Sequence, residues 1–87
     1  MAASVTLVTA TGTAAPLVTV APGSRATIQN QGSSSAWIGI GSGVTSGNGL
    51  LMVPNATLSE LECSGDSADA WYVISTSGTT MAVITGA

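Results

Sequence analysis

The amino-acid sequence predicts an all-β fold of about eight short antiparallel strands in a β-sandwich or a jelly-roll-like barrel, with essentially no helix. β-Branched and apolar runs of about five to eight residues alternate with clusters of Gly, Pro, Asn and Ser, which is typical of short strands joined by tight turns. No window shows the apolar period of about 3.6 residues that an amphipathic helix requires. Residues 1–87 together are the size of one domain.

Four strands are expected in the first half of the chain, each bounded by turn residues: 4–10, 17–20, 25–31 and 36–40. Val5 and Leu7 lie two residues apart in the first strand, so they share one of its faces. Pro22-Gly23 precedes the third strand, and the Gly- and Ser-containing residues 32–35 follow it. A short turn between two strands predicts that the third and fourth form a β-hairpin.

Four more strands are expected in the second half: 50–53, 57–63, 71–76 and 80–85. Pro54-Asn55 is expected to be a turn, and the last two strands are expected to form a hairpin around Ser77-Gly78. Between the two halves, residues 41–49 carry four glycines. This is the longest segment that is not expected to be regular strand.

The two halves share a faint internal similarity. Pro22, Ala26–Ile28 and Ala36–Ile38 are followed later by Pro54, Ala56–Leu58 and Ala70–Tyr72 in the same order. Two similar hairpins packed face to face would form a two-layer sandwich. Chance similarity in a chain rich in Ser, Thr and Ala is the alternative.

Charged side chains are scarce. The chain has one basic residue, Arg25, four acidic residues, and no Lys or His, with a net charge of −3. Clustered basic residues are needed to bind a phosphate backbone, so no nucleic-acid partner is expected. Without a His or Lys base we expect no enzyme, no catalytic residue and no cofactor. No run approaches the roughly 18 apolar residues of a membrane span, and no secretory signal peptide is recognisable.

The acidic residues and the cysteine have structural interpretations. Glu60 and Glu62 share one face of a strand, with Asp66 and Asp69 close by, and carboxylates are calcium ligands. The spacing fits no EF-hand loop, and acids on an edge strand also prevent unwanted pairing, so no metal site is predicted and calcium remains the alternative. Cys63 is the only cysteine, so no intrachain disulfide can form, and we expect a small buried side chain.

Seven residues are the candidate contacts with a partner: Val5, Leu7, Trp37, Gly43, Val44, Thr45 and Tyr72. Residues 1–10 are either the first strand of the domain or an arm exchanged with a neighbour. The glycine-rich loop is either a surface that moulds to a partner or a plain connector. The only aromatic residues, including Trp71, are expected in core or subunit packing, with sugar stacking as the alternative.

The sequence resembles the small β-sandwich proteins that decorate or cement tailed-bacteriophage heads, and the related domains of head fibres and tail appendages. The resemblance spans about Val5 to Gly86 and is carried by Ala26–Ser33, Trp37–Gly39, Gly43–Thr45, Asn48-Gly49, Pro54, Leu58, Trp71–Ile74 and Ser77-Gly78.

The resemblance implies a non-enzymatic capsid decoration protein that is made in the host cytoplasm and binds the outside of the virion. Its partners would be the major capsid protein lattice and other copies of itself, with a homotrimer favoured. Many weak contacts on a lattice gain avidity, which suits a chain with so few charges. The alternative is a receptor- or glycan-binding module of a phage fibre or tail tip.

Overall fold

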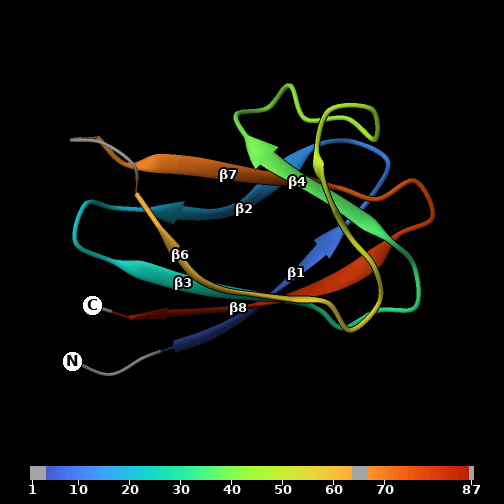
Figure 1. The fold of residues 1–87 in the computed structure, drawn as a ribbon. Helices are drawn as coiled ribbons and strands as arrows, with labels where there is room; N and C mark the ends of the chain where they lie inside the picture. The colour runs from blue at the N-terminus through green and yellow to red at the C-terminus, as the bar shows by residue number, and fades with distance from the viewer. Residues whose placement is uncertain (1–3, 64–66, 87) are drawn as a thin grey trace.

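In a computed structural model, which describes residues 4–63 and 67–86, the chain forms two four-stranded antiparallel sheets packed face to face (Figure 1). The strands are β1 (Ser4–Ala10), β2 (Ala15–Val20), β3 (Arg25–Asn30), β4 (Ala36–Ile40), β5 (Leu50–Met52), β6 (Thr57–Glu62), β7 (Asp69–Ile74) and β8 (Thr79–Gly86). The described residues contain no helix. The predicted all-β fold is confirmed, and strand ends differ from the expected ones by no more than two residues.

The strand order is that of a jelly roll. One sheet has the order β1-β8-β3-β6 and the other β2-β7-β4-β5. The first strand therefore pairs with the last, the second with the seventh, the third with the sixth and the fourth with the fifth. A long hairpin whose tip is the loop between β4 and β5 has been rolled so that successive pairs fall in alternate sheets, which is the topology of the double-sheet jelly roll.

Two predicted hairpins are wrong. β3 and β4 lie in different sheets, and so do β7 and β8. The chain leaves β7 at Ser75, whose backbone N–H donates to the carbonyl oxygen of Thr11 at 2.8 Å and whose hydroxyl donates to the carbonyl oxygen of Ser35 at 2.7 Å. These bonds tie Ser75 to two other loops and not to a following partner strand. Of consecutive strands, only β4 and β5 pair with each other in the described part of the chain.

The internal similarity corresponds to neighbouring strands and not to two hairpins packed face to face. β3 pairs with β6 in one sheet, and β4 pairs with β7 in the other. The turn before β3 and the turn before β6 are alike. The N–H of Ser24 donates to the carbonyl oxygen of Ala21 at 3.0 Å, and the N–H of Ala56 donates to the carbonyl oxygen of Val53 at 2.9 Å. Each has proline second and a positive φ third, 83° at Gly23 and 70° at Asn55, as a type II turn requires.

The core lies between the two sheets and is made by alternate residues of every strand pair. Its buried members are Ala10, Leu17, Ile28, Ala36, Ile38, Met52, Val73, Met81 and Val83. Trp71 packs against this cluster, whereas its neighbour Tyr72 points to the other side of the sheet, as residues adjacent on a strand must. In the same way Ile38 is buried, and Trp37 lies on the outer face.

Candidate interaction surfaces

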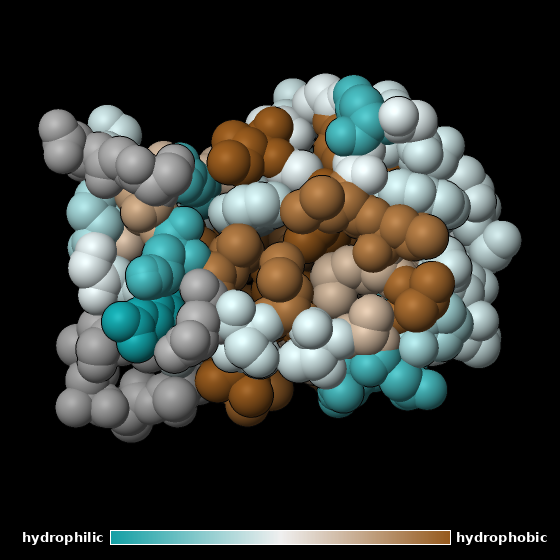
Figure 2. Space-filling view, in the orientation of Figure 1, coloured by the Kyte–Doolittle hydropathy of each residue, from teal (hydrophilic) through white to brown (hydrophobic). Residues whose placement is uncertain are grey.

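Hydrophobic side chains gather on the face of the molecule that carries β4 and β5 (Figure 2). Leu50 and Leu51 are each 57% exposed, and Ile40 and Val53 are exposed as well. β5 has only three residues and forms the edge of its sheet, so no further strand covers it. We call Ile40, Leu50, Leu51 and Val53 the β5 patch.

The β5 patch was not among the candidate contacts. Leu50 pairs with buried Ile38 and Leu51 pairs with outward-facing Trp37, so both faces of this strand are apolar. The signal in the sequence is the unbroken apolar run Leu50–Val53, where a half-buried strand would alternate. Large apolar side chains exposed together at a sheet edge are typical of interaction sites.

A second apolar surface lies on the outer face of the other sheet. Val5 of β1 pairs with Ile84 of β8, and Leu7 pairs with Ala82 in the same register. Val5 is 66% exposed and Leu7 is 63% exposed. We call the exposed residues Val5, Leu7 and Ile84 the β1 stripe; Ala82 lies beside them but is buried. Residues 4–10, within the segment proposed as a strand or an exchanged arm, pair along their whole length with β8 of the same chain, and residues 1–3 lie outside the described residues.

The glycine-rich loop is a packed structure and not a plain connector. Asn48 Oδ1 accepts the N–H of Thr45 at 2.7 Å, and the Asn48 side-chain amide donates to the carbonyl oxygen of Gly43 at 3.2 Å. Val44, at the centre of the loop, is only 5% exposed. A Cβ at Gly49 would lie 2.8 Å from Trp37 Cβ and 2.9 Å from Val44 Cγ2, so the missing side chain leaves room for Val44 beside the tryptophan.

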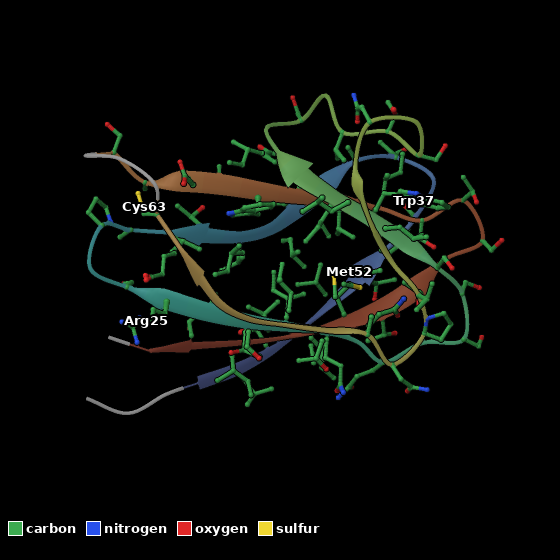
Figure 3. All side chains as sticks on the ribbon, viewed as in Figure 1. Arg25, Trp37, Met52 and Cys63 are labelled. Carbon is green, nitrogen blue, oxygen red and sulfur yellow. The ribbon has the colours of Figure 1, made fainter. Side chains whose placement is uncertain are left out.

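The structure divides the seven candidate contacts between two faces. Val5 and Leu7 lie on the outer face of the β1 sheet. Trp37 and Tyr72 lie half-buried on the outer face of the β4 sheet, where the loop covers Gly39 next to them. Figure 3 shows Trp37 toward the end of the sandwich away from Arg25 and Cys63. Exposed Gly43 and Thr45 stand beside Val44, which serves as packing in this arrangement and not as a surface contact.

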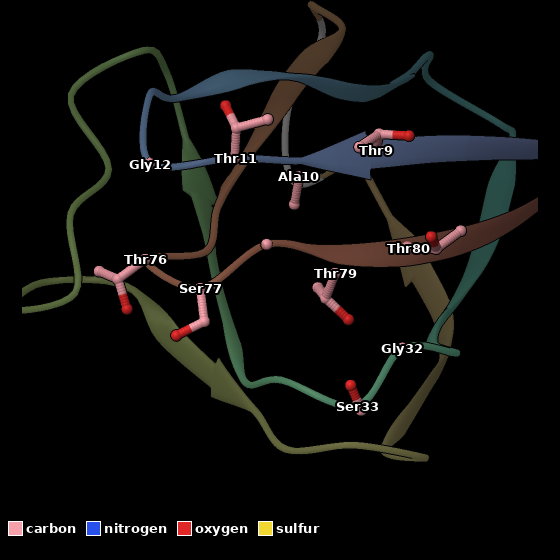
Figure 4. A pocket seen from close by; sticks show the side chains of 11 residues that line it. Thr9, Ala10, Thr11, Gly12, Gly32, Ser33, Thr76, Ser77, Thr79 and Thr80 are labelled. Carbon is pink, nitrogen blue, oxygen red and sulfur yellow. The ribbon is translucent and has the colours of Figure 1, made fainter.

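A hollow of about 590 Å³ opens at one end of the sandwich (Figure 4). Three loops surround it, those that follow β1, β3 and β7. Its lining is made of small residues without charge or aromatic rings, and the hydroxyl-bearing ones include Thr9, Thr11, Ser33, Thr76, Ser77 and Thr80. Such a surface can donate and accept hydrogen bonds in many directions.

Asn30 holds this end of the molecule together. The side chain is fully buried, and its amide donates to the carbonyl oxygens of Ser34 at 2.8 Å and Met52 at 2.9 Å. Its Oδ1 accepts the N–H of Gly32 at 3.1 Å and the hydroxyl of Thr79 at 2.7 Å. Every hydrogen-bonding position of the amide is therefore used. This one polar side chain fixes the loop that follows β3 and links three of the described strands, β3, β5 and β8.

Arg25, Glu62 and Cys63 lie toward the other end. Arg25 Nε and Glu62 Oε1 are 3.7 Å apart, and both side chains are more than half exposed. No group of three metal-ligating side chains occurs among the side chains that the structure describes, which do not include that of Glu60. Asp66, one of the acids considered for calcium, lies outside the described residues. Cys63 is only partly buried, and its thiol donates to the carbonyl oxygen of Ser67 at 2.8 Å, so the expectation of a buried side chain is wrong.

Residues 4–63 and 67–86 contain no helix that could cross a bilayer. Comparisons with protein-family models, with curated proteins and with solved structures find no match to this chain.

Proposed function

We propose that this protein is a non-enzymatic decoration protein that binds the outer surface of a bacteriophage capsid and stabilises it. The observation that carries the proposal is the β5 patch on a small jelly roll with almost no charge. The patch exposes four large aliphatic residues at one sheet edge, and burying such surface against a partner is the main favourable term in protein association.

The arrangement suits many weak contacts on a repeating surface. A ligand that binds only the assembled shell stabilises that shell by mass action. Copies held at neighbouring lattice positions act together, so each single contact can be modest. The resemblance of the sequence to head-decoration proteins supports the same role, with the major capsid protein as partner, the virion exterior as location and a symmetric oligomer as the bound form.

The experiment measures occupancy on purified phage heads that lack the protein. Leu51→Lys places a charge within the β5 patch, and we expect it to lower occupancy at least tenfold. The matched control is Thr76→Lys, which introduces the same charge at an exposed position at the hollow. Heads that bind both variants like the wild type would overturn the β5 patch as the contact. Heads that bind no wild-type protein would overturn the decoration role.

The second candidate function is a glycan-binding module of a phage fibre or tail tip, and the hydroxyl-lined hollow favours it. Sugar hydroxyls would exchange hydrogen bonds with the Thr and Ser side chains that line the hollow. A glycan array with the wild type and Thr76→Lys tests it. Binding that Thr76→Lys abolishes would support this function, and an array without binding would leave the hollow as an ordinary loop surface.

A further inference from the structure

We propose that the outer edge of β1 pairs with β1 of a second copy of this chain, so that two sheets join into one continuous eight-stranded sheet. The unpaired backbone groups of an edge strand are a template for another strand, and natural proteins block such edges by recognisable means. The two sheets have four edges: β1, β6, β2 and β5.

Three of the four edges carry a blocking feature. β2 contains Pro16, and its pairing with β7 shifts register between Pro16 and Val18. β5 has only three residues. β6 carries Glu62, and its pairing with β3 shifts register within the strand. Proline, shortness, charge and bulges are the devices that keep an edge from pairing.

β1 has none of these features. It has seven residues, contains neither a charged residue nor proline, and pairs with β8 in seven successive positions without a shift. Val5, Thr6, Leu7 and Thr9 are exposed, so this stretch of the strand is accessible, whereas Ala10 at its end is buried. A long, regular, uncharged edge that exposes aliphatic side chains is predicted to pair with another chain.

The pattern of edges also selects the occupant. Because the other three edges are blocked, a second copy can offer a compatible strand only through its own β1. Pairing of one surface with itself is two-fold symmetric and closed, so it stops at two copies. A two-fold axis perpendicular to the sheet makes the two β1 strands antiparallel, and all strand pairs described within this fold are antiparallel as well.

Charge is consistent with this occupant. The described acid Glu62 lies on β6, the edge opposite β1 in the same sheet. In the joined sheet the two β6 strands are the outermost ones, so the Glu62 side chains of the two copies are kept far apart. The β1 stripes of the two copies meet at the centre, where no charged side chain lies. This inference does not depend on the proposed function.

The first experiment measures the mass in solution as a function of concentration. We expect the wild type to form a dimer and Leu7→Lys to be a monomer, because the substitution puts a positive charge on each side of the paired edge. Ser59→Lys is the matched control, since Ser59 is exposed on β6 at the opposite edge, and it should remain a dimer. Thr9→Lys, exposed on β1 as well, repeats the test should Leu7→Lys fail to fold.

The second experiment tests the pairing itself. Residues opposite each other across antiparallel strands share a face. With a two-fold axis perpendicular to the sheet, one residue of β1 must therefore lie directly opposite the same residue of the second copy. Cysteine at that position then faces its own copy at disulfide distance. In a Cys63→Ser background, one of Val5→Cys, Thr6→Cys, Leu7→Cys, Val8→Cys and Thr9→Cys should cross-link efficiently on oxidation, and Ser59→Cys should not.

Three results would overturn the proposal. The first is a wild type that stays monomeric at every concentration. The second is a dimer or a trimer whose mass neither Leu7→Lys nor Thr9→Lys changes. The third is a monomer that loses capsid binding with Leu7→Lys, which would assign the edge to a strand of a capsid subunit. A dimer that binds no heads would leave the pairing intact and remove only the proposed function.

Discussion

The hydroxyl of Thr79 donates a hydrogen bond to Asn30 Oδ1 at 2.7 Å, across 49 residues of sequence and between the ends of two neighbouring strands of one sheet. Both side chains are buried, and Asn30 carries the bond to Met52 in the opposite sheet as well. This polar contact therefore joins the two layers at the end where the hollow opens. Buried polar networks of this kind are strongly stabilising only when every member is satisfied, as it is here.

Thr79→Val should lower the free energy of unfolding by about 1–3 kcal/mol, because it keeps the shape of the side chain and removes one hydrogen bond to a buried acceptor. Urea denaturation measures the change. Thr80→Val is the control, since the Thr80 side chain lies on the outer face of β8 and is only half-buried. Equal losses in both variants would show that the Thr79 hydroxyl adds nothing beyond ordinary strand propensity.

Gly32→Ala should destabilise the protein by about 1–3 kcal/mol, the usual cost of forcing extra atoms into a packed site. A Cβ at Gly32 would collide with Thr79 Oγ1 and lie 2.9 Å from the backbone nitrogen of Thr80. Gly12→Ala is the matched control, because nothing lies within 4 Å of a Cβ there. Thermal melting of both variants checks the prediction, and a Gly12→Ala loss as large as that of Gly32→Ala would contradict it.

Val44→Ala should lower the free energy of unfolding by about 1.6 kcal/mol, because it removes two buried carbon atoms worth about 0.8 kcal/mol each. It should also speed hydrogen exchange at the Gly49 amide, which donates to the carbonyl oxygen of Thr45 at 3.0 Å and closes the loop. Ser46→Ala, exposed in the same loop, should change neither quantity. Unchanged exchange in Val44→Ala would mean that the loop keeps its shape through the Asn48 hydrogen bonds alone.

The strands and most turns could be predicted from the sequence because their signals are local. Alternation of side chains along Arg25–Asn30 follows from the period of a strand, and Pro22-Gly23 has a steric preference for one turn type. The distribution of strands between sheets could not be predicted, because a short turn can close a hairpin or carry the chain to the other layer. What decides is a set of contacts remote in sequence, such as that between Ser75 and Ser35.

The candidate surfaces were predicted in part for the same reason. The apolar face of β1 follows from the spacing of Val5 and Leu7 alone. The burial of Val44 depends on the absence of a side chain at Gly39 and Gly49, which the fold brings beside it. The exposure of Leu50 depends on the shortness of β5 and on its place at a sheet edge, and neither follows from apolar residue type.

Glu62→Gln should change the free energy of unfolding by less than about 1 kcal/mol, because exposed ion pairs gain little Coulomb energy in water and are screened by salt. Arg25 and Glu62 pair across β3 and β6 with an N–O distance of 3.7 Å and exposed side chains. The melting midpoint of the wild type should accordingly be almost independent of ionic strength.

Thr79→Val should lower the free energy of unfolding clearly more than Glu62→Gln does, although it removes an interaction between neutral groups. At the surface, water can take the place of the Glu62 carboxylate beside Arg25. Between the sheets, no group takes the place of the Thr79 hydroxyl that donates to Asn30 Oδ1. A larger loss in Glu62→Gln than in Thr79→Val would reverse this ranking.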